Sequence, residues 1–315
     1  MRRLGIYGYR KVAALGILLV CSYPALCEQS EKTVARTANW SVLWQPKRLV
    51  NGSPVIFRVS PPVGLSSLSG DWLGHTVTFA FDEENRTWDG FAGINLTTAA
   101  GEYSIELHGI TAAGKSISFQ RRLRTVRGKY RNVTVNVPKQ FTEPSKEQLE
   151  RIAQDKAIKE ALFAQMTPEQ EWSGEFRAPV QARISDVFGT TRTFNGKVQS
   201  VHQGLDYAVP SGTPVEALNS GTVLLARPLF FEGNCVVLDH GQGLLTLYLH
   251  FSDIKVKEGE QVTRGQVLGM SGGSGRATGP HLHVAVRWQG VYLDPATLLA
   301  LRLWKNESAK PKSVG

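Results

Sequence analysis

Cysteine is scarce in this chain of 315 residues, which contains only Cys21, Cys27 and Cys235. Cys21 and Cys27 fall in a segment with the features of a cleavable leader, so the mature chain keeps one cysteine and can form no internal disulfide. Cys235 stands in the apolar run Cys235-Val236-Val237-Leu238, where a buried thiol is expected rather than a nucleophile or a metal ligand. A scaffold held together by disulfide bonds is therefore excluded.

A bilayer-length hydrophobic run is also missing near the N-terminus, where a basic start precedes a short apolar stretch. The stretch from Val12 to Val20 is shorter than the roughly 20 residues that a spanning helix needs. Ala25 and Cys27 place small residues three and one before a cleavage point, so residues 1–27 are predicted to be a secretory signal peptide. The alternatives are an uncleaved membrane anchor and a lipoprotein modified at a leader cysteine.

Charge of one sign does not dominate the mature chain. The whole sequence carries a net charge of +9, and the first 27 residues hold four basic and no acidic residues, so removing them leaves +5. That balance suits loose attraction to an anionic cell wall. No nucleic-acid motif accompanies it, so nucleic acid is not an expected partner. At 20% charged and 42% hydrophobic residues, the chain is globular, and its length allows two domains and a linker.

Residues 38–137 contain short alternating runs separated by turn residues. Strands at this spacing predict a small all-β sandwich. Gly101-Glu102-Tyr103, followed by an alternating strand, resembles an immunoglobulin-like domain. His75 and His108 have no ligand-like neighbours in sequence, so structural roles are expected for both. The expected strands are Val55 to Val59, Thr76 to Ala80, Tyr103 to Leu107, Ser116 to Arg122 and Asn132 to Val137.

Residues 142–170 are predicted to form a helical linker, capped by Thr142 or Ser145. Its apolar stripe is expected to pack on one or both domains. Residues 175–303 are strand-rich with glycine turns and form the second domain, and residues 304–315 are a polar tail. The fold class is therefore mainly β. The residues of the stripe are Leu149, Ile152, Ala153, Ala161, Leu162 and Met166.

Two histidines stand two residues apart in Gly279-Pro280-His281-Leu282-His283. The residues that follow alternate, so on a strand His281 and His283 share one face while Leu282 and the residues in step with it form a buried face. Zinc in a catalytic site takes three neutral imidazole or carboxylate ligands from protein and leaves a position for water. A His-x-His pair alone is also compatible with an incidental surface pair.

A second polar face is found in His202-Gln203-Gly204-Leu205-Asp206. On a strand, His202, Gly204 and Asp206 lie together and Leu205 lies opposite, with the apolar residues that follow in step. The four-residue spacing would also suit a helix, but Gly204 and a nearby proline oppose that. Alone, the pair is an ordinary imidazole–carboxylate contact. Taken with the two histidines of the later strand, it favours a metal site.

A third strand ends in Tyr248-Leu249-His250, where His250 alternates with leucines and is expected on the polar side. The glycine-rich stretch from Ser271 to Gly279 directly precedes His281 and is expected to form a groove wall. It is no phosphate loop, because no helix start with a lysine follows it. No H-E-x-x-H helix occurs, so the glutamate base of the usual metalloproteases is missing.

Together, H-x-G-x-D, then Y-x-H, then G-P-H-x-H resemble the lysostaphin/LytM-type zinc endopeptidases of bacterial cell walls. The resemblance covers about residues 175–300 and includes Val187-Phe188-Gly189. It implies an antiparallel β peptidase domain with one zinc ion per chain. By this resemblance, the zinc ligands are His202, Asp206 and His283, and the residues beside the water that the metal activates are His250 and His281.

The resemblance implies an exported enzyme, in the periplasm or the extracellular cell wall, whose partner is peptidoglycan peptide. An N-terminal accessory domain is typical of periplasmic members that open the D-alanine to diamino-acid cross-link, so D,D-endopeptidase action is expected. Three alternatives remain open. They are cleavage of glycine bridges, activation of a wall amidase without catalysis, and metal binding or wall anchoring without hydrolysis.

Overall fold

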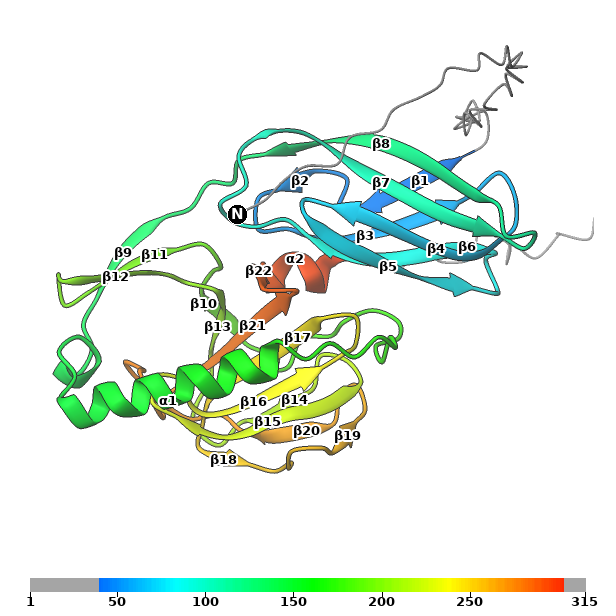
Figure 1. The fold of residues 1–315 in the computed structure, drawn as a ribbon. Helices are drawn as coiled ribbons and strands as arrows, with labels where there is room; N and C mark the ends of the chain where they lie inside the picture. Colours follow the sequence, from blue (N-terminus) through cyan, green and yellow to red (C-terminus); the bar gives the residue numbers. More distant parts are fainter. Residues whose placement is uncertain (1–39, 303–315) are drawn as a thin grey trace, which may run out of the picture. The chain divides into compact units, whose positions relative to one another are not determined.

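The computed structural model describes residues 40–302. These residues form β-sheets with one long helix, so the expected mainly β fold class is confirmed (Figure 1). The predicted leader, residues 1–27, and the predicted polar tail, residues 304–315, lie outside the described residues. Within the described range, no helix has the length and apolar character needed to cross a membrane.

The N-terminal part is one connected sheet of eight strands that pair in the order β1-β3-β6-β5-β4-β7-β8-β2. Strand β5 joins its two halves, because its end pairs with β6 and its start pairs with β4. The strands are β1 (Ser41–Gln45), β2 (Leu49–Val50), β3 (Pro54–Ser60), β4 (Leu65–Trp72), β5 (His75–Asp82), β6 (Thr87–Gly93), β7 (Gly101–Thr111) and β8 (Ser116–Val126).

Alternating side chains explain why this sheet forms. In β7, Ile105 and Leu107 are buried while Glu102 and Glu106 are exposed, so one face of the strand packs and the other meets water. The expected strands near β3, β5, β7 and β8 are present. Strand β4 was not predicted, because its sequence, Leu-Ser-Ser-Leu-Ser-Gly-Asp-Trp, offers few apolar residues.

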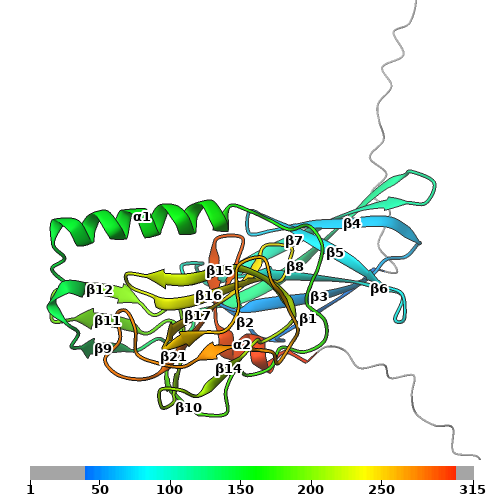
Figure 2. The same ribbon diagram turned by 90° about the horizontal axis from the view of Figure 1, so that it is seen from below.

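The expected strand at Asn132 forms, but it pairs outside the N-terminal sheet. Strand β9 (Asn132–Val135) runs parallel to β11 (Thr191–Phe194), which pairs with β12 (Val198–Val201). Both views show β9, β11 and β12 side by side (Figures 1 and 2). A segment that follows the N-terminal sheet in sequence thus adds a strand to a hairpin from the second half of the chain.

The expected linker helix is α1 (Lys146–Phe163), preceded by a short 3₁₀ turn at Lys139–Phe141. Ser145 caps α1, and its hydroxyl accepts from the backbone N–H of Gln148. The face that packs is centred on Ile158 and Leu162, which lie against the hairpin of β15 (Gly221–Leu229) and β16 (Gly233–Asp239). Leu149, assigned to the apolar stripe from sequence, is 54% exposed, so the real contact face is rotated away from the predicted one.

The second half of the chain contains an antiparallel sheet with a small sheet beside it. Helix α2 (Pro295–Ala300) follows, capped by Asp294. The main sheet has the order β10 (Arg183–Asp186), β13 (Gly204–Ala208), β21 (Leu282–Trp288), β17 (Leu244–Phe251), β16 (Gly233–Asp239), β15 (Gly221–Leu229) and β19 (Gln261–Val262), with β22 (Val291–Leu293) paired to β21. The small sheet contains β14 (Pro214–Glu216), β20 (Val267–Met270) and β18 (Asp253–Ile254).

A chain of hydrogen bonds runs through the core of this sheet. The Tyr248 hydroxyl accepts from the backbone N–H of Leu218 at 2.8 Å and lies 3.1 Å from the Thr246 hydroxyl. Thr246 in turn contacts His240, whose other ring nitrogen donates to the Ser220 carbonyl at 2.6 Å. Burial lowers the pKa of His240 to about 4, so the ring is neutral at pH 7. These contacts give His240 a structural role in the core.

Replacing Tyr248 with phenylalanine is expected to destabilise the protein. The change leaves the Leu218 N–H without its buried acceptor and removes one of the two contacts of the Thr246 hydroxyl, which costs about 1–3 kcal/mol of unfolding free energy. Tyr103→Phe is the control, because that hydroxyl bonds Ala99 at the surface and its loss should cost less than about 0.5 kcal/mol. Urea unfolding measures both. Equal effects in the two variants would contradict a stabilising role for the buried chain.

Candidate metal centre

Two neighbouring strands bring the candidate ligands together. Strands β13 and β21 run antiparallel with Asp206 opposite His283. The predicted alternation is confirmed on both strands, since Leu205 and Tyr207 on β13 are buried in the core and so are the residues in step with Leu282 on β21. His202 directly precedes β13. The remaining face therefore carries two imidazoles and a carboxylate.

Three ligand atoms meet at one point. His202 Nε2 lies 3.0 Å from Asp206 Oδ1 and 3.0 Å from His283 Nδ1, and His283 Nδ1 lies 2.8 Å from Asp206 Oδ1. These residues form a group of His and Asp side chains able to hold a metal ion. Two nitrogens and one oxygen at such separations match the ligand set of a site that leaves one coordination position open.

Hydrogen bonds outside the triangle fix its rings and charges. His202 Nδ1 donates to the Val187 carbonyl at 2.8 Å, which leaves Nε2 with its lone pair. Burial lowers the pKa of His283, which favours the neutral ring that metals require. Burial alone would raise the pKa of Asp206, but its close contacts with the His202 and His283 rings outweigh that effect and hold the pKa far below its ordinary value.

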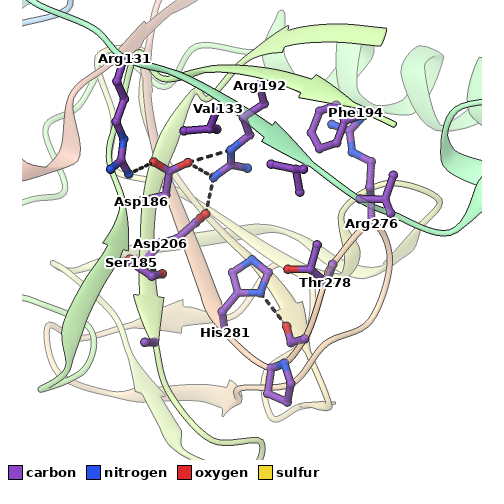
Figure 3. Close-up of a pocket in the computed structure, with 16 residues that line it drawn as sticks. Arg131, Val133, Ser185, Asp186, Arg192, Phe194, Asp206, Arg276, Thr278 and His281 are labelled. Carbon is purple, nitrogen blue, oxygen red and sulfur yellow. Dashed lines mark hydrogen bonds and ion pairs between the residues drawn. The ribbon is translucent and has the colours of Figure 1, made fainter. Parts of the chain in front are cut away.

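The second oxygen of Asp206 is held by a network of arginines and aspartate. The Arg192 guanidinium bonds Asp206 Oδ2 and also bonds Asp186 at 2.6 and 2.8 Å. Asp186 in turn binds Arg131, from the segment just before β9. Figure 3 shows these side chains in line from Arg131 to Asp206. The network aims one oxygen of Asp206 at the histidines by occupying the other.

The missing side chain of Gly204 leaves room for the imidazole ring of His283. A Cβ atom at this position would lie 2.5 Å from His283 Nε2 and 2.4 Å from the Val284 carbonyl oxygen. The imidazole of His283 thus lies directly over the Gly204 backbone. The glycine of the H-x-G-x-D motif is required by this close approach, whereas the backbone angles of the residue are not unusual.

His250 reaches the site in a different way from the one predicted. Thr246 and Tyr248, which are in step with His250 along the strand, point into the core, and Leu247 and Leu249 lie on the face of His283. His250 has φ +67°, a left-handed conformation that interrupts the alternation. The expectation that His250 continues the alternation of this strand is therefore wrong, although the structure does bring its ring beside His281 and His283.

The two further histidines lie against each other beside the ligands. The ring centroids of His250 and His281 are 4.7 Å apart, and those of His250 and His283 are 6.2 Å apart. His250 Nδ1 bonds the Ser274 carbonyl at 2.7 Å, and His281 Nδ1 bonds the Gly279 carbonyl at 2.8 Å. Burial, together with repulsion from His281 and His283, lowers the pKa of His250 to about 3, so His250 is neutral near pH 7.

The site opens into a groove with two hollows. One, of about 400 Å³, has Asp206 and His281 in its wall and is bounded on another side by valines of the β9 segment (Figure 3). The other, of about 160 Å³, is lined by His202, His250 and His283. The glycine-rich loop before His281 borders the first hollow, as expected from sequence.

Sequence reasoning missed Asp186, Arg192 and Arg276, which also line this groove. Asp186 and Arg192 flank the recognised Val187-Phe188-Gly189 stretch, and that position was the available signal. Arg276 is the one charged residue in the glycine-rich loop from Ser271 to Gly279. Arginines and aspartates are common at protein surfaces and form no pattern of their own, so none of these three residues was singled out from sequence.

Comparisons with known proteins agree with this geometry. Residues 200–295 match the model described as peptidase family M23. A crystal structure of an M23-type protein from Pseudomonas aeruginosa is 31% identical, with a TM-score of 0.60, and the match covers 80% of this chain and 95% of that one. The chain belongs to peptidase family M23. All five histidine and aspartate positions fall within the matched residues.

Curated M23 relatives are similar over a shorter stretch. The peptidoglycan DD-endopeptidase ShyA of Vibrio cholerae is 46% identical over 110 residues, which are 34% of this chain and 26% of ShyA. The DD-carboxypeptidase/endopeptidase Mpg of Neisseria meningitidis is 39% identical over 119 residues, which are 38% of this chain and 27% of Mpg. The match thus spans about a quarter of each curated relative.

Adding one methyl group at Gly204 is expected to remove metal from this M23 site. Gly204→Ala forces the His283 ring away from the other two ligand atoms, so the metal content of the purified protein should fall severalfold or more. Gly279→Ala is the matched control in the later motif, because its Cβ would meet nothing within 4 Å. Elemental analysis measures both proteins. Full metal content in Gly204→Ala would contradict the geometry described here.

Proposed function

We propose that this protein is an exported zinc endopeptidase that hydrolyses peptide bonds of bacterial peptidoglycan, acting on the D-alanine to diamino-acid cross-link. The observation that carries the proposal is the convergence of three ligand atoms beside two further imidazoles on an open groove. Two relatives from different organisms have names that include DD-endopeptidase or endopeptidase activity, which supports the same reaction. Their substrate lies outside the cytoplasm, which supports export to the periplasm or cell wall.

One zinc ion per chain fits the residues present. His202 Nε2, Asp206 Oδ1 and His283 Nδ1 would hold it, with neutral rings and an ionised carboxylate as zinc requires. Ligand atoms around a tetrahedral zinc at about 2.0 Å lie roughly 3.3 Å apart. The present separations of 2.8–3.0 Å need only a small expansion to reach that value.

The two remaining histidines would transfer protons in different steps of the reaction. Bound zinc supplies a Lewis acid and a water nucleophile at neutral pH. The Nδ1–H of His250 is committed to the Ser274 carbonyl, so Nε2 carries the lone pair and would accept the proton that the nucleophile gives up. His281 is the more exposed ring, positioned at the groove wall to donate a proton to the amine leaving group.

The domain organisation is part of the proposal. Residues 38–137 form an immunoglobulin-like domain, 142–170 a helical linker, and 175–303 the peptidase domain. The strand orders β1-β3-β6-β5 and β4-β7-β8 support the immunoglobulin-like assignment, since they correspond to the A-B-E-D and C-F-G sheets of the constant-type fold. The pairing of β9 with β11 indicates that the end of the first domain takes part in the groove.

A non-catalytic activator of a wall amidase fits this chain less well. Such a protein has no need for a complete set of ligands with two imidazoles packed beside them, yet all five positions are filled. The same argument applies to a wall-anchoring module without hydrolysis. Cleavage of glycine bridges differs only in the peptide bound, so the substrate must be tested directly.

Single histidine substitutions should separate metal binding from chemistry. His250→Ala and His281→Ala are expected to keep zinc and lose activity on the order of 100-fold, the scale of one general acid or base. His283→Ala is the contrasting variant, and it should lose both zinc and activity. Zinc analysis and digestion of purified cell wall measure the two properties. Parent-like digestion by both catalytic variants would require the mechanism to be abandoned.

The bond specificity is tested with defined substrates. The mature protein should convert cross-linked muropeptide dimers to monomers and leave pentaglycine intact, and a chelator should stop the reaction. Chromatography with mass measurement identifies the products. Rapid cleavage of pentaglycine, with dimers untouched, would reverse the substrate assignment while leaving the zinc site standing.

A further inference from the structure

Arg276 lies in the loop between β20 and β21, within the wall of the groove. Its guanidinium carbon lies 4.5 Å from the ring centroid of Phe194 and 4.7 Å from that of Phe231. Figure 3 shows the arginine beside Phe194, across the hollow from Asp206 and His281. Rings against a planar guanidinium hold it in place and leave its N–H groups at the edge to meet other partners.

Those N–H groups have no acceptor in the part of the chain that the structure describes, since no hydrogen bond or ion pair of the Arg276 side chain is found there. Glu232 is the acidic residue whose charge acts on Arg276, but its carboxylate is paired with Lys159. The neighbouring Arg192 is different, because its Nε and Nη2 groups bond Asp186 and Asp206. Arg276 is thus a positive charge held beside the site without a neutralising partner.

The location of Arg276 connects it to the reacting groups. It borders the hollow that contains His281 and also the hollow that contains His250 and His283. A peptide seated across the candidate metal centre therefore passes the guanidinium edge. The first hollow is also lined by uncharged valines and by Arg131 and Arg192, whose guanidinium groups are paired with aspartates.

We propose that Arg276 anchors a carboxylate of the substrate, and that this anchor selects cross-links made to a diamino diacid. The inference rests on the proposed function. In such a cross-link the residue that provides the amine keeps a free carboxylate on the carbon next to the scissile nitrogen. A guanidinium with free edges binds a carboxylate through two parallel hydrogen bonds. Pentaglycine, and cross-links to a diamino monoacid, have no carboxylate at that position.

The test compares two dimers that differ in one group. One dimer has the free carboxylate beside the scissile amide, and the other has the same position amidated. The parent should prefer the free acid by about 10-fold or more, the scale of a charge-assisted pair. Arg276→Gln should lose this preference by raising KM for the acid dimer about 10-fold, with kcat and zinc content little changed. Arg276→Lys should recover part of it, because lysine keeps the charge without the fork.

Lys257→Gln is the matched control, since it removes one positive charge from an exposed position in the turn before β19. It should keep the parent's preference. An Arg276→Gln variant that still prefers the acid dimer would overturn the proposal. Equal loss on both dimers would also overturn it, because that result indicates a role in supporting the loop only.

Failure of the proposed function is distinguishable from failure of the anchor. If the parent hydrolyses neither dimer, the proposed reaction is wrong, and the anchor is then tested by binding. Calorimetry with the zinc-loaded His281→Ala protein, with and without Arg276→Gln, measures affinity for both dimers without turnover. Tighter binding of the acid dimer that depends on Arg276 supports the anchor. Equal binding of the two dimers overturns it.

Discussion

The divided carboxylate of Asp206 is the interaction on which the site depends. One oxygen meets His202 and His283, and the other meets Arg192. A carboxylate this deeply buried is unstable unless both oxygens are satisfied. Arg192 supplies a positive charge to Oδ2, and the two histidine rings contact Oδ1. The antiparallel register sets Asp206 opposite His283, which brings Oδ1 to the histidines and leaves Oδ2 for Arg192. The pairing of the two strands therefore fixes the geometry of the candidate ligands.

The two polar faces could be predicted from sequence because strand alternation is local, whereas the choice of His202, Asp206 and His283 as ligands came from the family resemblance. Leu205 and Leu282 mark the buried faces of their strands, and the polar residues in step with His202 and His283 must then share the opposite side. The fold class followed from the same regularity. The limits of the method appear where the backbone departs from it, as at β4, whose serines and glycine conceal a strand from any hydrophobic pattern.

His250 shows a second limit. Its left-handed backbone turns the side chain out of step with Tyr248, so period-two reasoning put the right residue on the wrong face. Arg192 and Arg276 show a third limit, since their importance comes from partners far away in sequence. Arg192 matters because of Asp206, and Arg276 because Phe194 and Phe231 close on it. Contacts between distant residues, and departures from ideal geometry, are decided by tertiary packing that no local pattern encodes.

The parallel pairing of β9 with β11 has a consequence for what counts as the working unit of this protein. The segment that brings β9 also brings Arg131, the first member of the chain of charges that ends at Asp206. A fragment starting after β9 would keep all five histidine and aspartate residues of the motifs. It would nevertheless lose a valine wall and leave Asp186 with one arginine fewer. The motifs mark where the candidate ligands lie, whereas the contacts that hold Asp206 extend upstream to Arg131, within the residues that the strand pattern assigns to the first domain.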